Sequence, residues 1–126
     1  SAYFSPNNFD VFINGKSKDA FGKGYRAFLN TVLALTLMKY LAERGKYAPG
    51  ILVVDSPILS LKERGDEKTP DTMKTALFKY LLDNQNYGQV IIIENNVPKL
   101  DYSKANVIAF TKDETQGRYG FLNGVR

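Results

Sequence analysis

The sequence contains no cysteine and no histidine. Without cysteine, disulfides and thiolate metal sites are excluded, and a reducing compartment is permitted. Without histidine, Ser-His and Cys-His catalysis and the commonest metal ligand are excluded as well. These two absences remove most of the familiar routes to nucleophilic catalysis and to metal binding.

Long apolar runs are also missing. No run reaches the roughly 18 apolar residues of a membrane span. The first six residues, Ser-Ala-Tyr-Phe-Ser-Pro, lack the basic and apolar regions of a signal peptide and include no initiating Met. We therefore expect a soluble, cytoplasmic protein without a membrane partner, cut or processed from a longer chain.

The chain has 126 residues, which fits one domain spanning 1–126 and is smaller than most complete nucleotide hydrolases. Its formal charge is +4, from 17 basic and 13 acidic residues. This mild excess of positive charge does not by itself indicate a nucleic-acid surface.

The most informative stretch is residues 50–57, where four β-favouring apolar residues are followed by Asp55, Ser56 and Pro57. Such a run is typical of a strand buried on both faces of an α/β sheet. An acid at its carboxyl end would lie where α/β folds bind ligands, and could hold hydrated Mg²⁺ beside a phosphate. The alternative is a core strand followed by a capping Asp and a turn.

Residues 1–7 are expected to be irregular and residues 9–13 to form a strand. Asn14-Gly15 then predicts a hairpin turn with a short polar return arm over 16–19. Gly15-Lys16-Ser17 could be the end of a phosphate-binding P-loop, but that motif needs a glycine where Asp10 stands. We interpret the segment as a turn.

Two helices are expected. The first begins around residues 21–25, continues to about Arg44 with apolar residues nearly all round it, and is capped by Gly45. This pattern predicts a helix that is buried on most sides or packed under a sheet. The second begins at Thr69-Pro70-Asp71, with Thr69 as its cap, and stops within residues 83–86. Its expected apolar face consists of Met73, Ala76, Leu77, Tyr80 and Leu81.

Further strands are expected over 89–94, 107–110 and 118–122, the last two paired across a turn at 112–117. Two buried strands separated by a helix imply a right-handed parallel crossover. The expected fold class is therefore α/β, with a partial mixed sheet of buried parallel strands, flanking helices and some strands missing.

Residues 21–28, the long helix and residues 51–57 together resemble the C-terminal lobe of ABC-type ATPases, most closely the SMC/RecF-like group of chromosome and DNA-repair ATPases. In that group a signature of the form L-S-G-G-[QE]-[KR]-A-L opens a helix. Phe21 takes its Leu position and Gly22 its Ser. Lys23 and Gly24 take the two glycines, and Tyr25 and Arg26 follow, then Ala27-Phe28. The likeness covers about residues 21–96.

In the same group, a Walker B strand ending D-E-P follows 20 to 30 residues later. Asp55 falls on the Walker B acid, Ser56 on the catalytic Glu, residues 57–67 on the D-loop region and Asn95 on the switch His. The resemblance thus implies a P-loop NTPase-like C-terminal half in which residues 22–26 contact ATP and Asp55 holds Mg²⁺.

The resemblance also implies what the chain lacks. The Walker A loop and the glutamine loop of this group lie in an N-terminal lobe, so this fragment should not form a complete ATP site alone. The implied partners are that lobe, a second ATPase head whose ATP the signature turn touches in trans, and DNA as the usual partner of the group.

Two departures bear on hydrolysis. Ser56 cannot act as the general base that a Glu would provide, and Asn95 cannot carry the charge of a His. Three acids of the following loop, Glu63, Asp66 and Glu67, are alternative sources of the base, although such a run of charges is typical of a solvated loop.

Two functions follow, with a third less favoured. The first is half of an ATPase head, with ATP joining two heads and weak hydrolysis releasing them. The second is a non-catalytic α/β interaction domain in which Asp55 and the glycines are structural. A small-molecule hydrolase using Ser56 or Ser60 is disfavoured because no base is positioned for either.

Overall fold

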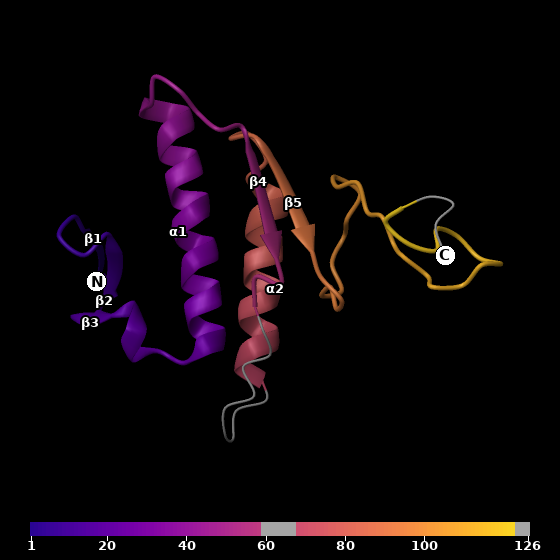
Figure 1. Ribbon diagram of the computed structural model, residues 1–126, viewed down its shortest axis with the longest axis horizontal. Coiled ribbons are helices and arrows are strands. Elements are labelled where there is room, and N and C mark those ends of the chain that lie inside the picture. Colours follow the sequence, from indigo (N-terminus) through magenta and orange to yellow (C-terminus); the bar gives the residue numbers. More distant parts are fainter. Residues whose placement is uncertain (59–67, 123–126) are drawn as a thin grey trace.

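The computed structural model describes residues 1–58 and 68–122, and for residues 68–70 the backbone alone. In chain order the elements are β1 (Ala2–Ser5), β2 (Asp10–Ile13), β3 (Lys16–Ser17), the 3₁₀ turn η1 (Lys18–Ala20), α1 (Lys23–Arg44), β4 (Ile51–Asp55), α2 (Lys68–Asp83) and β5 (Gln89–Ile93). Figure 1 shows a small N-terminal sheet on one side of α1 and the β4–β5 pair on the other. The fold is mixed α/β.

The N-terminal sheet has three antiparallel strands in the order β1-β2-β3. The hairpin turn is where the sequence predicts it, with both Asn14 and Gly15 at positive φ, as tight hairpins require. The expectation of an irregular segment over residues 1–7 is wrong, because β1 pairs with β2 there. Phe9 lies outside β2, in the connecting turn, with a φ of 49°.

One ion pair fixes the end of the hairpin. The Lys18 ammonium lies 2.8 Å from the Asp10 carboxylate, which also accepts the Val11 N–H. The hydrogen bond from Lys18, and then that from Val11, lowers the pKa of Asp10 below its ordinary value. A P-loop would have a glycine at position 10. Asp10 instead stabilises the hairpin through these contacts.

Helix α1 has a glycine as its cap at each end. Gly22 is its N-cap in extended conformation, without a side-chain cap. At the other end Gly45 donates its N–H to the Leu41 carbonyl at 2.9 Å, but its backbone is extended rather than left-handed. A Cβ on Gly45 would lie 2.6 Å from the Leu41 oxygen. Gly45 is therefore the C-cap, as predicted. Glycine is favoured there because the Leu41 carbonyl comes too close for a Cβ.

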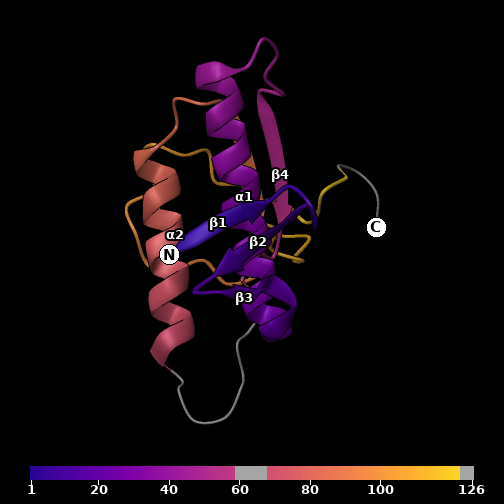
Figure 2. The same cartoon turned by 90° about the vertical axis from the view of Figure 1, so that its left-hand side faces the viewer.

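Of the two alternatives predicted for α1, packing against a sheet is confirmed and burial on most sides is not. Leu29, Thr31 and Met38 are its buried residues, whereas Leu37 is 48% and Tyr40 60% exposed. The helix packs on the β4–β5 sheet and beside α2, and Figure 2 shows the N-terminal sheet crossing only part of its outer side. The helix therefore has more apolar surface than the other described elements cover.

Helix α2 begins at Lys68, one residue before its predicted cap, and ends at Asp83 as expected. Its buried face differs in part from the prediction. Leu77 and Phe78 are buried, whereas Ala76 and Tyr80 are exposed. Among the helices that the structure describes, none is long and apolar enough to cross a membrane.

The two central strands pair in parallel, as the crossover predicts. Ile51 lies opposite Gln89, and the register continues to Asp55 opposite Ile93. Exposure alternates along both strands, so that every second residue faces the helices. The expectation of strands buried on both faces is therefore wrong, because α1 and α2 cover the same face of the sheet (Figures 1 and 2).

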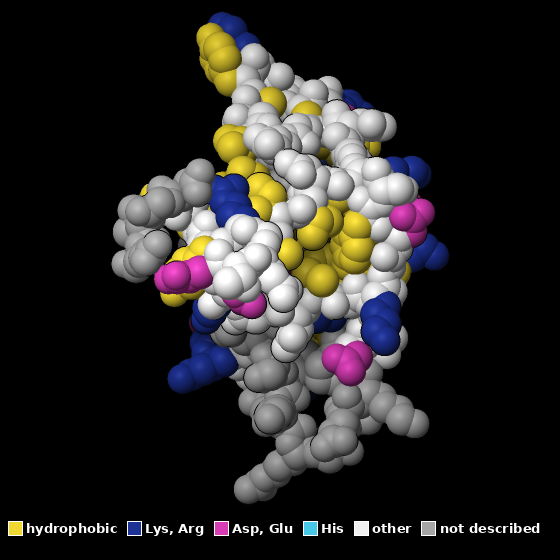
Figure 3. Space-filling model, turned by 90° about the vertical axis from the view of Figure 1, so that its right-hand side faces the viewer, with side chains coloured by type: hydrophobic (Ala, Val, Ile, Leu, Met, Phe, Trp, Pro, Cys, Tyr) yellow, Lys and Arg dark blue, Asp and Glu magenta, His cyan; other side chains and the backbone are white. Residues whose placement is uncertain are grey.

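The other face of the sheet is open. Its apolar residues are between 39% and 57% exposed: Ile51, Val53, Ile91 and Ile93. Figure 3, which views the molecule from the right-hand side of Figure 1, shows hydrophobic side chains at the surface near its middle. We call these four residues the open face. A continuous run of β-branched residues thus has only one of its two faces covered.

The two strands expected near the C-terminus do not form. Residues 107–110 and 118–122 meet at a single bridge between Phe110 and Arg118. Next to it, Thr111 donates its N–H to the Arg118 carbonyl at 2.9 Å. This segment extends away from β5 (Figure 1), so it has no sheet to pair with, and β propensity alone does not produce a strand.

Gly88, at the entry to β5, lies where helix and strand meet most closely. Its φ is 135°, and a Cβ there would lie 2.4 Å from the Met38 methyl and 2.5 Å from the Gly50 carbonyl oxygen. The Gly50 oxygen also accepts the Gln89 N–H at 2.8 Å, which begins the strand pairing.

We expect Gly88→Ala to lower the free energy of unfolding by about 3 kcal/mol, because it adds a backbone clash to a left-handed strain. Urea denaturation measures this loss. Gly120→Ala is the matched control, since a Cβ there meets nothing within 4 Å, and it should change stability by less than about 0.5 kcal/mol. Equal effects at the two positions would contradict the described approach of Gly88 to Gly50.

Candidate functional site

The candidate site lies at the carboxyl edge of the β4–β5 sheet. The carboxyl ends of both strands point the same way as the N-terminal ends of α1 and α2 (Figure 1). Helix N-termini carry partial positive charge, and α/β sheets bind ligands outside the carboxyl ends of their strands. The polar residues at this edge are therefore the first candidates for function.

Asp55 ends β4 as the sequence predicts. It is exposed, and its Oδ1 accepts the Ser56 hydroxyl at 2.9 Å. By alternation along the strand it shares the open face with Val53 and lies opposite Ile93 of β5. Its carboxylate is accordingly at the rim of the sheet, accessible to a ligand approaching from the open face.

Ser56 turns the chain back into the core. It has a φ of 48°, unusual for a residue with a Cβ, and it donates its N–H to the Ile93 carbonyl at 2.9 Å. Pro57 is fully buried directly afterwards and Ile58 is 5% exposed. Three features thus fix Ser56. They are its backbone hydrogen bond to β5, its hydroxyl hydrogen bond to Asp55, and the burial of the next two residues.

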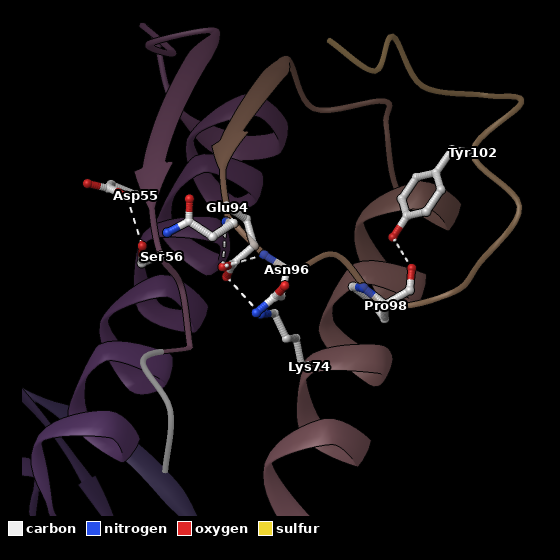
Figure 4. A network of polar contacts seen from close by, with 8 residues as sticks. Asp55, Ser56, Lys74, Glu94, Asn96, Pro98 and Tyr102 are labelled. Atoms are coloured by element: carbon white, nitrogen blue, oxygen red, sulfur yellow. Dashed lines mark hydrogen bonds and ion pairs between the residues drawn. The ribbon is translucent and has the colours of Figure 1, made fainter. Parts of the chain in front are cut away.

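Glu94 forms the best-connected polar cluster at this edge (Figure 4). Its Oε1 accepts the N–H of Asn95 at 2.8 Å and of Asn96 at 3.3 Å. Its Oε2 is buried with no hydrogen-bond partner among the described residues, but lies 3.0 Å from the Lys74 ammonium of α2. The two side chains are 8% and 16% exposed, so this ion pair is largely shielded from water.

The two acids at the edge face opposite ways. Figure 4 shows the Asp55 side chain pointing away from Glu94, which is directed toward α2. Asn95, which the resemblance places at the position of the switch His, donates its backbone N–H to Glu94 and is exposed. The contacts in the structure therefore connect Asp55 with Ser56 and Asn95 with Glu94, in two separate groups.

The predicted phosphate-binding turn forms the first turn of α1. Arg26 donates its N–H to the Gly22 carbonyl at 3.0 Å, and its guanidinium lies 3.8 Å from the Asp19 carboxylate. Tyr25 stacks on Phe21 with ring centroids 5.2 Å apart. In the structure, Arg26 therefore takes part in an ion pair at the surface.

The remaining members of the turn are Lys23 and Gly24. Lys23 is exposed, and Gly24 lies within the helix. The first N–H groups of an α-helix have no intrahelical acceptor, and Gly22 offers those of α1 no side-chain cap. This turn contacts its own neighbours, Asp19 and Phe21, and not Asp55.

The chain folds over itself after the cluster. Tyr102 donates its hydroxyl to the Pro98 carbonyl at 2.7 Å (Figure 4), and burial raises the pKa of the Tyr102 hydroxyl. One residue earlier, Asp101 accepts the Ser103 N–H at 2.9 Å, which lowers the pKa of that carboxyl. These local bonds shape the exit from the site and leave its edge open.

Sequence reasoning assigned no role to Lys74 or Glu94. The available signal was Glu94 itself, an acid directly after an apolar strand, in the same kind of position as Asp55. Its partner could not be found from spacing, because Lys74 lies 20 residues earlier in the sequence and meets Glu94 through tertiary packing.

Asp55 is the exposed acid at this edge. Within residues 1–58 and 68–122, no group of three or more Asp and Glu side chains could hold a metal ion. A cation at this edge would therefore have fewer than three carboxylates of the described chain as ligands. The loop residues proposed as alternative bases or nucleophiles, Ser60, Glu63, Asp66 and Glu67, lie outside the described residues.

Comparisons with protein families, with curated proteins and with solved structures find no match to this chain. The argument for function therefore depends on the geometry of the site and on the motifs of the sequence.

The left-handed backbone of Ser56 gives a direct test of this edge. We expect Ser56→Val to lower the free energy of unfolding by about 1–2 kcal/mol, because a β-branched side chain is strained at positive φ. Ser56→Gly should lose less, since glycine adopts this conformation freely, although it also loses the hydroxyl bond to Asp55. Urea denaturation of both variants compares them; a less stable glycine variant would contradict the described turn.

Proposed function

We propose that this chain is the C-terminal half of an ATPase head of the SMC/RecF-like group. It would supply the turn Gly22–Arg26 and the acid Asp55 to ATP sites completed by an N-terminal lobe and a second head. The observation that carries the proposal is the exposed Asp55 at the carboxyl end of β4, in a parallel pair with helix N-termini at the same edge. DNA is the target suggested by the group.

The Asp55 carboxylate fits a magnesium ion of the kind that accompanies nucleotides. Mg²⁺ in such sites takes one or two carboxylates and completes its shell with water and phosphate oxygens. Asp55 is exposed, has the Ser56 hydroxyl beside it and belongs to no group of three or more acids among the described residues. When bound, the ion would neutralise charge on the phosphates.

The first turn of α1 fits a phosphate. Gly22 leaves the helix N-terminus without a side-chain cap, and Lys23 is exposed beside it. Free N–H groups and the positive end of the helix dipole favour an anion there. Since Arg26 is held only by a 3.8 Å ion pair at the surface, it could exchange Asp19 for a phosphate at little cost.

The separation of this turn from Asp55 agrees with action in trans. Each group would contribute to a different ATP, with the turn touching nucleotide held by the partner head. Hydrolysis should be slow, because Ser56 cannot accept the proton of an attacking water as a carboxylate would. The Asn95 amide could orient that water without taking up its proton.

We expect Asp55→Ala, made in the longest native polypeptide that contains this chain, to abolish Mg-ATP binding and ATP-dependent dimerisation. The reason is loss of the exposed carboxylate at the carboxyl edge of the sheet, since the other acid there, Glu94, is paired with Lys74. Isothermal titration with Mg-ATP and sedimentation with and without nucleotide measure the two effects. Asp83→Ala is the control, since this exposed acid lies at the opposite end of α2. A folded parent protein that binds no ATP would refute the proposal.

A second candidate is a non-catalytic interaction domain, favoured by the open face. Its four half-exposed apolar side chains lie together on one sheet surface. Contiguous exposed apolar residues are typical of protein-interaction sites, whereas single ones are not. On this interpretation Asp55 caps a strand. Because the domain hydrolyses nothing, Ser56 in place of a catalytic Glu and the absence of histidine do not impair its function.

For this candidate we expect Val53→Lys to abolish binding of the partner protein while Asp55→Ala leaves it intact. A lysine in the middle of the open face would place a charge in the interface. Val107→Lys is the control, because Val107 is 59% exposed and Val53 is 57% exposed, and it lies away from the sheet. Co-purification with the partner measures binding; intact binding by Val53→Lys would exclude the open face as the interface.

A further inference from the structure

Glu94 uses its two carboxylate oxygens for two different parts of the chain. Oε1 accepts the N–H groups of Asn95 and Asn96, which folds the turn directly after β5. Oε2 lies 3.0 Å from the ammonium of Lys74, which comes from the first two turns of α2. One side chain therefore connects the turn after the strand to the crossover helix.

A buried ion pair is not needed to form the turn after β5. An uncharged acceptor would satisfy the two N–H groups, whereas a carboxylate that is 8% exposed must be compensated for its lost hydration. Lys74 supplies that compensation at its own cost, since its side chain is only 16% exposed. The charge thus adds a rigid connection to α2 that the turn alone would lack.

The connection lies at the carboxyl edge of the sheet (Figure 4). Asn95 follows Glu94 directly, and its backbone N–H is fixed by the Glu94 carboxylate at 2.8 Å. On the neighbouring strand, the Ser56 N–H is fixed by the Ile93 carbonyl at 2.9 Å. The residues next to the edge are thus positioned from two sides, one of which depends on Lys74.

We propose that Lys74 and Glu94 form a positioning pair: Lys74 orients Glu94, and Glu94 holds the turn that places Asn95 at the ligand edge. The effect on ATP turnover rests on the proposed function, but the effect on the turn does not. Neither residue acts on the nucleotide directly. Their contribution is to keep Asn95 in one place, and small displacements of such groups slow a reaction strongly.

The test uses Lys74→Met in the longest native polypeptide that contains this chain. We expect amide hydrogen exchange at Asn95 and Asn96, measured by NMR or mass spectrometry, to accelerate at least tenfold, since the carboxylate that holds them loses its partner. ATP turnover should fall by about tenfold, with the KM for ATP changed by less than about twofold. Lys74→Arg, which can still pair with Glu94, should restore both.

Three further variants separate positioning from simple stability. Lys79→Met removes an exposed lysine of the same helix and should change neither quantity. Lys74→Met combined with Glu94→Gln leaves no unpaired charge, so it folds even if the single variant does not, and it should still show reduced turnover. The exchange Lys74→Glu with Glu94→Lys restores an ion pair but offers Asn95 and Asn96 no carboxylate, so their amides should remain unprotected.

The outcomes distinguish this inference from the proposed function. Wild-type exchange and turnover in both Lys74→Met and the uncharged double variant would overturn the positioning pair. Full recovery by the charge exchange would also overturn it, because a pair that only stabilises the fold is restored by reversal. If the wild-type protein binds no ATP, the proposed function fails, and amide exchange at Asn95 and Asn96 alone decides whether the pair holds the turn.

Discussion

Two parallel strands cannot be joined by a tight turn, so pairing β4 with β5 requires the chain to cross back over the length of the sheet. Helix α2 makes that crossing, and most of what is described here depends on it. Gly88 must be glycine because the chain enters β5 against Gly50 and Met38. The register that follows places Asp55 opposite Ile93, and so brings both strand ends to one edge.

The second constraint is that α1 and α2 both cover the same face of this small sheet. The helical face of each strand is buried in part, while the open face keeps four half-exposed apolar side chains. The same shortage of neighbours leaves Leu37 and Tyr40 of α1 in water. Apolar surface in this amount is typical of a chain that meets another protein surface, and both candidate functions supply one: an N-terminal ATPase lobe or an interaction partner.

At the ligand edge, two acids in similar sequence positions have different environments. Asp55 follows an apolar strand, is exposed and has a hydroxyl beside it. Glu94 also follows an apolar strand, but it points toward α2, is buried and faces an ammonium. An exposed carboxylate can accept a cation from solution, whereas a buried and paired one is better suited to hold its surroundings in place. This difference is why we propose a cation site at Asp55 and a positioning role for Glu94.

Local chemistry in the sequence determined the hairpin at Asn14-Gly15, the limits of α1 and the strand ending at Asp55, because turn residues, helix periodicity and apolar runs act over a few residues. The parallel pairing of the two central strands was predictable for the same reason, from the helix between them. Tertiary structure alone decided that the helices lie on one face, that residues 107–110 form no strand despite their β-branched residues, and that Lys74 meets Glu94. These depend on which distant surfaces are present to pack against, and no local pattern contains that information.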